Sequence, residues 1–177
     1  MLRAVAEDDL LVAGVTLAGQ YRDREGDIAW LTEEGYAARL AQGQAAKAKY
    51  EATGEIDYVA AVDEFDMNVG MPGKFVWDWY HVWAEKGLWD NRYAVMSDAD
   101  LLPYESISAA QALTKPYLLI HSDNSFLPDA ARRHFEVMPS TRKTLLWDGD
   151  TPHLSYYDVP EVLDRTANSI DRWVSTL

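Results

Sequence analysis

The chain has 177 residues, of which 48% are hydrophobic, and its 29 acidic and 16 basic residues give a formal net charge of −13 at pH 7. This length suffices for one domain with a buried core. The acidic excess disfavours nucleic acid and anionic membrane surfaces as partners, and the absence of cysteine excludes disulfides and cysteine-based nucleophiles or metal sites.

No apolar run is long enough to span a bilayer, and residues 2–9 lack the apolar core of a signal peptide. We therefore expect a soluble, cytoplasmic protein that does not bind membranes.

Residues 2–9 have the composition of a helix, and the apolar run Leu11–Ala18, which ends at Gly19, is typical of a buried strand.

Residues 23–112 contain helical patterns interrupted by glycines and no comparable β-branched run, which predicts a helical insertion. Residues 27–50 predict one or two helices, and residues 56–66 predict another.

Residues 75–86 predict a helix that is apolar on nearly all sides and rich in aromatic residues. Its candidate substrate-pocket residues, which would line an apolar site beneath a lid, are Trp77, Trp79, Tyr80 and Trp83. The alternative, which we favour, is that this aromatic helix packs on the sheet or on another subunit.

The remainder of the chain alternates between helices and extended runs. In chain order the pattern predicts a helix at residues 106–113, a strand at Tyr117–His121, a helix at residues 129–137, a strand at Lys143–Trp147 and a helix from Pro160 onward. Strands separated by helices favour parallel pairing, and hence a three-layer α/β arrangement with about three strands.

Four segments resemble the C-terminal portion of α/β-hydrolases of the esterase, dienelactone-hydrolase and peptidase-like kind. They are "LRAVAEDDLLVAGVTLAGQYRD", "YESISAAQALTKPYLLIHS", "FLPDAARRHFEVMP" and "LLWDGDTPHLSYYDVPEVLDRTANSIDRWV". The resemblance implies one partial α/β-hydrolase-like domain over residues 1–177, with residues 23–112 as a helical lid or cap inserted within it.

By this resemblance His153 is the general base of a catalytic triad and Asp123 is the acid that orients it. Asp129, Asp98 and Asp100 are alternative acids. The other reading of His153 is a surface-loop histidine without a catalytic task.

The chain departs from the family because it contains no Gly-x-Ser-x-Gly elbow, and none of its nine serines lies between the glycines that a strained elbow requires. We therefore expect serine-hydrolase ancestry, with ester or amide hydrolysis only if a nucleophile is supplied from elsewhere, and an inactive isolated chain. The alternative function is a non-catalytic module that binds small molecules or proteins.

The partners expected are a small apolar acyl or aromatic ligand and further copies of the chain. Because the strand at Leu11–Ala18 would lie at a sheet edge, we expect a homo-oligomer through this edge, through the aromatic helix, or through both. The four histidines lack metal-ligand spacing, so neither a metal nor another cofactor is expected.

Overall fold

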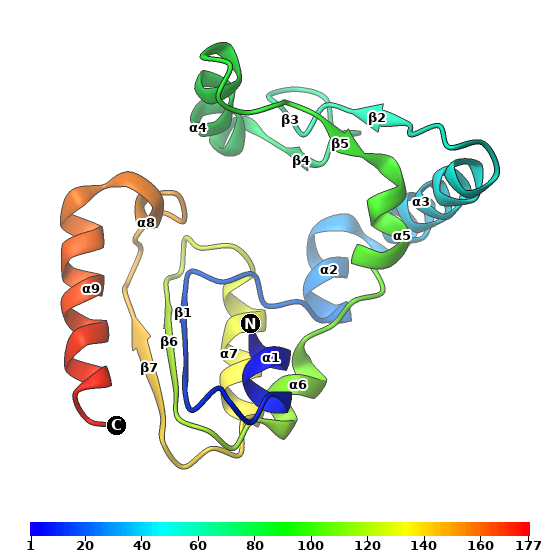
Figure 1. The fold of residues 1–177 in the computed structure, drawn as a ribbon. Helices are drawn as coiled ribbons and strands as arrows, with labels where there is room; N and C mark the ends of the chain where they lie inside the picture. Colours follow the sequence, from blue (N-terminus) through cyan, green and yellow to red (C-terminus); the bar gives the residue numbers. More distant parts are fainter. The chain divides into compact units, whose positions relative to one another are not determined.

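The computed structural model describes residues 1–177 and divides into two compact units (Figure 1). Met1–Trp30 and Glu105–Leu177 form the first, which we call the sheet unit. Leu31–Tyr104 form the second, which we call the inserted unit because the chain leaves the sheet unit to form it and then returns.

A parallel three-stranded sheet is the centre of the sheet unit. Its strands are β1 (Gly14–Leu17), β6 (Tyr117–His121) and β7 (Lys143–Trp147), in the order β1-β6-β7. The predicted bounds of the second and third strands are confirmed to the residue, and so is the three-stranded parallel α/β arrangement.

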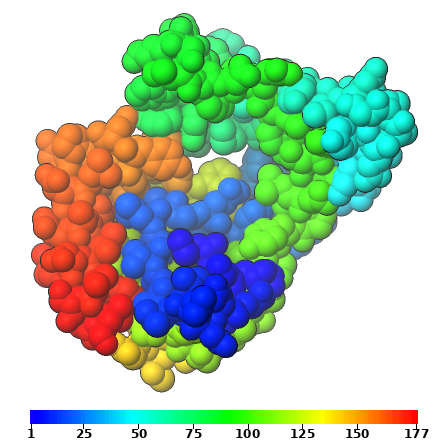
Figure 2. Space-filling model, in the orientation of Figure 1, coloured from blue at the N-terminus to red at the C-terminus, as the bar shows by residue number.

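The first strand is shorter than the predicted Leu11–Ala18. Asp8 forms a turn in which its side chain accepts a hydrogen bond from the Leu10 amide at 2.9 Å and its carbonyl accepts one from the Leu11 amide at 3.0 Å. This turn keeps the first residues of the apolar run out of the sheet. Leu10 and Val12 are consequently 88% and 77% exposed, and the dark-blue surface of the first residues is open on the face shown in Figure 2.

Helices cover both faces of this sheet (Figure 1). One face packs against α1 (Leu2–Glu7), α6 (Ile107–Ala112) and α7 (Pro128–Val137), while α8 (Ser155–Asp158) and α9 (Pro160–Val174) cover the other.

Successive side chains of β6 point to opposite faces, as the pleat of a strand requires. Tyr117 and Leu119 join the core on the α1, α6 and α7 side, whereas Leu118 and Ile120 join Val162 and Tyr156 on the α9 side. All of β6 is buried because both of its faces and both of its edges are covered.

The sheet unit also contains most of α2 (Arg24–Leu31), and the inserted unit contains short elements around one long helix. These are α3 (Glu33–Thr53), β2 (Tyr58–Val59), β3 (Val62–Asp63), β4 (Met71–Pro72), α4 (Lys74–Glu85), β5 (Tyr93–Ala94), the 3-10 helix η1 (Val95–Ser97) and α5 (Asp98–Leu101). Within this unit α3 packs on η1 and α5, and α4 packs on β3 and β4. No helix of the chain is long and apolar enough to cross a membrane.

The predicted helix at residues 56–66 is wrong. β2 pairs there with β5 and β3 pairs with β4. The carboxylate of Asp63 accepts hydrogen bonds from the amides of Phe65 and Asp66, both at 2.8 Å, and thereby forms a turn. Aspartate side chains compete with helix formation in this way, and they outweigh the apolar spacing on which the prediction rested.

Candidate functional site

The candidate site is formed by the two loops that follow β6 and β7, at the carboxyl ends of these strands. Hydrogen bonds join the loops directly: the Asp123 amide donates to the Gly149 carbonyl at 2.7 Å, and the His153 amide donates to the Asn124 carbonyl at 3.1 Å. Ser122 Oγ also donates to the Thr151 carbonyl at 2.6 Å. The second loop therefore holds His153 in a fixed position beside the first.

The imidazole of His153 has one partner at each ring nitrogen. Nδ1 accepts a long hydrogen bond of 3.4 Å from the backbone amide of Phe126, and Nε2 lies 3.1 Å from the hydroxyl of Tyr157. Because an amide N–H can only donate, Nδ1 carries no hydrogen and Nε2 carries it instead. A triad histidine needs the opposite tautomer, with Nδ1–H facing a carboxylate and Nε2 free to accept a proton.

The pKa of His153 is lowered from its ordinary value, first by burial and then by the nearby His121 imidazole. An amide facing Nδ1 acts in the same direction, because protonation would place two donors against each other. In this arrangement His153 is a weak proton acceptor.

Asp123 is bound to Arg132 and not to His153. Its Oδ1 accepts a hydrogen bond from Arg132 Nη2 at 2.5 Å, which is the main reason that the pKa of Asp123 is lowered. Arg132 also pairs with Asp129 at 3.2 Å and lies over the ring of Trp147, 3.8 Å from its centroid. The assignment of Asp123 as the orienting acid stays a prediction, and the structure supplies no contact that supports it.

The other two candidate acids lie in the inserted unit. Asp98 is buried and bound by Arg39 Nε at 2.7 Å and by the Tyr93 hydroxyl at 2.5 Å. Asp100 pairs with Lys47 at 2.7 Å. Both carboxylates therefore have partners within their own unit.

His121, at the end of β6, is a fully buried histidine. Its Nδ1 lies 3.1 Å from the Ser122 carbonyl and its Nε2 lies 3.3 Å from the Gly19 carbonyl, and its ring stacks on Trp147 with the centroids 5.4 Å apart. Burial lowers the pKa of His121. These contacts join β6 to the ends of β1 and β7.

The predicted pocket residues all lie on α4, where they are half-buried. They contact one another and their neighbours: Trp79 lies against Tyr80 and Trp83, with centroids 4.7 and 5.7 Å apart, and Trp77 stacks on His81 at 4.8 Å. Ligand binding by these residues stays a prediction.

The inserted unit also has an open depression of about 560 Å3 that contains none of the predicted pocket residues. It is lined by Gln42, Ala45, Ala46, Lys49, Asp57, Tyr58, Val59 and Val95. No group of three or more histidine, aspartate or glutamate side chains in the chain is arranged to hold a metal ion.

Three solved structures have folds similar to the whole chain. The α/β hydrolase GrgF from Penicillium sp. sh18 has a TM-score of 0.67 at 18% identity, with 98% of this chain and 60% of that chain covered. A hypothetical protein from Pseudomonas aeruginosa has a TM-score of 0.67 at 18% identity, with 97% and 56% covered. The monoacylglycerol lipase of Paleococcus ferrophilus has a TM-score of 0.59 at 17% identity, with 98% and 63% covered.

The chain has the α/β-hydrolase fold. It spans between 56% and 63% of the length of these three structures. No protein-family model and no curated protein matches the sequence, so the similarity is one of fold.

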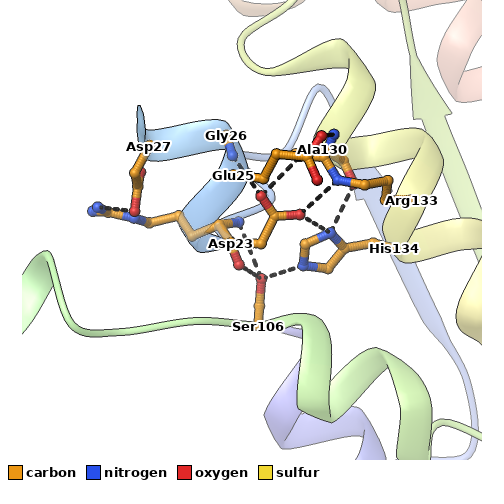
Figure 3. A network of polar contacts seen from close by, with 9 residues as sticks. Asp23, Glu25, Gly26, Asp27, Ser106, Ala130, Arg133 and His134 are labelled. Atoms are coloured by element: carbon orange, nitrogen blue, oxygen red, sulfur yellow. Dashed lines mark hydrogen bonds and ion pairs between the residues drawn. The ribbon is translucent and has the colours of Figure 1, made fainter. Parts of the chain in front are cut away.

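Besides the predicted site, this α/β-hydrolase-fold chain contains a buried polar network that sequence reasoning missed (Figure 3). Ser106 and His134 form its centre, with Ser106 Oγ 2.9 Å from His134 Nε2. The sequence places His134 among arginines on a helix, and only its position on the inward face of α7, beside Ala130 and Ala131, could have indicated burial.

Proposed function

We propose that the chain has serine-hydrolase ancestry and that these 177 residues do not hydrolyse esters or amides by themselves. The contacts of His153 carry this proposal, because its Nδ1 faces a backbone amide where a triad histidine requires a carboxylate. Two solved structures with this fold, an α/β hydrolase and a monoacylglycerol lipase, support the ancestry.

Ser106, whose hydroxyl lies beside the His134 ring, does not provide a nucleophile. Ser106 and His134 lie at hydrogen-bond distance, as the serine and histidine of a triad do, but Ser106 is 6% exposed and His134 is 0% exposed. A serine that attacks a substrate must meet it, so this pair supports a structural role.

Hydrolysis would require a serine from outside these residues. We propose that in such a complete site His153 is the base and Asp123 its orienting acid, with an apolar ester, thioester or amide as substrate. Asp123 would then have to exchange Arg132 for His153. A cytoplasmic location fits this proposal and stays a prediction.

A chromogenic ester assay with p-nitrophenyl acetate tests the proposal. We expect the chain and His153→Ala to have equal rates, within about twofold, because His153 receives no assistance from a carboxylate or a serine. His81→Ala is the matched control for unspecific catalysis by a surface imidazole. Turnover that falls at least about 100-fold in His153→Ala alone would refute the proposal.

Labelling with a fluorophosphonate probe is an independent test, since this reagent modifies activated serines covalently. We expect mass spectrometry to find no modified serine among the nine in the chain. Modification of Ser106 would assign it as a nucleophile instead.

A second candidate function is that of a binding or interaction module, and the edge of the sheet favours it. β1 is an outer strand, and the exposed Leu10 and Val12 lie in the segment before it. An edge strand beside exposed apolar side chains is a site for pairing with another chain. We propose that copies of the chain associate here, through the aromatic helix α4, or through both.

Native mass spectrometry of the wild-type chain and of Val12→Lys tests this association. We expect an oligomer that the added charge shifts toward monomer. A wild-type chain that is strictly monomeric at tens of micromolar would contradict it.

Quenching of tryptophan fluorescence by an apolar acyl or aromatic compound, lost in Trp83→Ala, would support the ligand proposed for α4.

A further inference from the structure

The two chain segments that lead into and out of the inserted unit are hydrogen-bonded to each other within the sheet unit. The Ser106 amide donates to the Arg22 carbonyl at 2.9 Å, and the Arg22 amide donates to Ser106 Oγ at 3.2 Å. Arg22 precedes α2 and Ser106 precedes α6. These bonds join positions that are 84 residues apart in the sequence.

His134 on α7 completes this arrangement, and its partners define its tautomer. Nδ1 lies 2.7 Å from the Ala130 carbonyl, which can only accept, so Nδ1 carries the hydrogen of the neutral ring. Nε2 is therefore the acceptor for the hydroxyl of Ser106. Neutral His134 thus provides an acceptor for Ser106, and Ser106 Oγ in turn accepts from Arg22. We call Arg22, Ser106 and His134 the connector cluster.

Charged groups surround the connector cluster on the side of α2 and α7. Asp23 Oδ2 lies 3.9 Å from His134 Nδ1, and Asp23 is held by two hydrogen bonds from Arg133 of 3.0 and 2.8 Å. The remaining groups around it are Glu25, which pairs with Arg133 at 2.8 Å, Asp27, which pairs with Arg22 at 2.9 Å, and the Tyr21 ring, 5.2 Å from that of His134.

The effects of burial and of Asp23 on His134 oppose each other. Asp23 favours a positively charged imidazole, but the side chain is fully buried, and the pKa of His134 is lowered because burial is the larger effect. A histidine whose pKa is lower in the closed form takes up a proton more readily once the site opens to water.

We propose that His134 makes the pairing of the two connecting segments within the sheet unit sensitive to pH: neutral His134 holds these segments together, and protonation favours their separation. The proton comes from solvent and binds Nε2. Ser106 then loses its acceptor at Nε2 and keeps the longer hydrogen bond of its hydroxyl to the Arg22 carbonyl, at 3.2 Å. The imidazolium is left at a fully buried position, and opening hydrates it. The proposal is independent of any role of His153.

Hydrogen exchange of the Ser106 and Arg22 amides, followed by NMR at pH 7.5 and pH 5, tests the proposal on the intact chain. From an ordinary histidine pKa of 6.5 in the open form, we expect the protection of both amides to fall by as much as about 30-fold. Protection that does not change with pH, after correction for intrinsic exchange rates, would refute it.

His134→Gln and His153→Gln form a matched pair for the same measurement. Glutamine can bind Ser106 but does not titrate, so the pH dependence should vanish in His134→Gln and persist in His153→Gln. A fall that survives in His134→Gln would overturn the proposal. If this variant fails to fold, titration of the His134 ring signals in the wild-type chain decides, because a midpoint at or above 6.5 would contradict a closed form that disfavours the proton.

Discussion

The two histidines that lie near hydroxyl groups hold opposite tautomers. In His134 a backbone carbonyl binds Nδ1–H and leaves Nε2 as an acceptor for serine, whereas in His153 a backbone amide faces Nδ1. The tautomer that suits proton acceptance from a hydroxyl therefore occurs where no substrate can reach it. A backbone carbonyl at Nδ1 makes His134 an acceptor for a hydroxyl at Nε2, whereas a backbone amide at Nδ1 leaves His153 with its hydrogen on Nε2.

Gly43 offers a test of close packing at the scale of a single residue. A Cβ at this position of α3 would lie 2.7 Å from the backbone nitrogen of Ala99 and 2.9 Å from Asp98 Cβ. We expect Gly43→Ala to lower the free energy of unfolding by about 1–3 kcal/mol, because α3 and α5 would have to move apart. Urea unfolding followed by circular dichroism measures the change.

Gly35→Ala in the same helix is the control for this substitution. The added Cβ would approach only Thr32 Oγ1, at the ordinary contact distance of 3.4 Å. Alanine should therefore raise the free energy of unfolding by about 0.5–1 kcal/mol through its higher helix propensity. Equal effects of the two substitutions would show that α3 does not approach α5 closely at Gly43.

At the scale of elements, the short strand β3 depends on a side chain that acts as a strand neighbour. Asn91 Oδ1 accepts from the Val62 amide at 2.8 Å, and Asn91 Nδ2 donates to the Val62 carbonyl at 3.0 Å. Val62 is fully buried, so these backbone groups have no access to water. The carboxamide thus replaces one residue of a partner strand.

We expect Asn91→Ala to lower the free energy of unfolding by about 1–3 kcal/mol, since it leaves a buried amide and carbonyl unsatisfied. Asn68→Ala, at an exposed position of the neighbouring turn, should change it by less than about 0.5 kcal/mol. Thermal unfolding of both variants measures the difference. A stable Asn91→Ala protein would mean that water replaces the carboxamide.

Element prediction succeeded for the second and third strands of the sheet and failed for the two-residue strands of the inserted unit. Tyr117–His121, which is buried throughout, and Lys143–Trp147, which is half-buried, were both predicted to the residue. β2 and β3 have two residues each, too few for a periodic signal, and Val62 is paired by a side chain 29 residues away. Such pairing is absent from any local pattern.

For the candidate site too, the sequence located residues but could not predict their contacts. The resemblance located His153 on the loop after the last strand, and the structure places it there beside the loop that follows β6. It did not locate the Phe126 amide at Nδ1, because every residue except proline has such an amide and only the fold selects one. Charge alone likewise could not show that Asp123 is bound to Arg132.

At the scale of the whole molecule, three buried or half-buried histidines should make stability depend on pH. The pKa values of His121, His134 and His153 are all lowered, chiefly by burial. The unfolded chain then binds more protons than the folded chain below about pH 6.5, so stability is fully present above this pH and is lost as the pH falls through it.

We expect the urea midpoint to fall between pH 7.5 and pH 5.5, with a loss of up to about 1.4 kcal/mol per pH unit for each of these histidines. The carboxylates with lowered pKa values, such as Asp23 and Asp148, contribute only near and below pH 4, outside this range. A midpoint that rises as the pH falls would contradict the lowered histidine pKa values.

The mutual hydrogen bonds of Arg22 and Ser106 mean that the chain makes its long excursion from a single point of the sheet unit. From that point α2, with eight residues, extends about 12 Å, so about six flexible residues would suffice to link Trp30 directly to Glu105. Grafting such a bridge in place of Leu31–Tyr104 should leave a miniature protein that folds around β1, β6 and β7. Because the two ends lie close together, the same position should also accept the insertion of an unrelated domain while the core of the sheet unit stays intact.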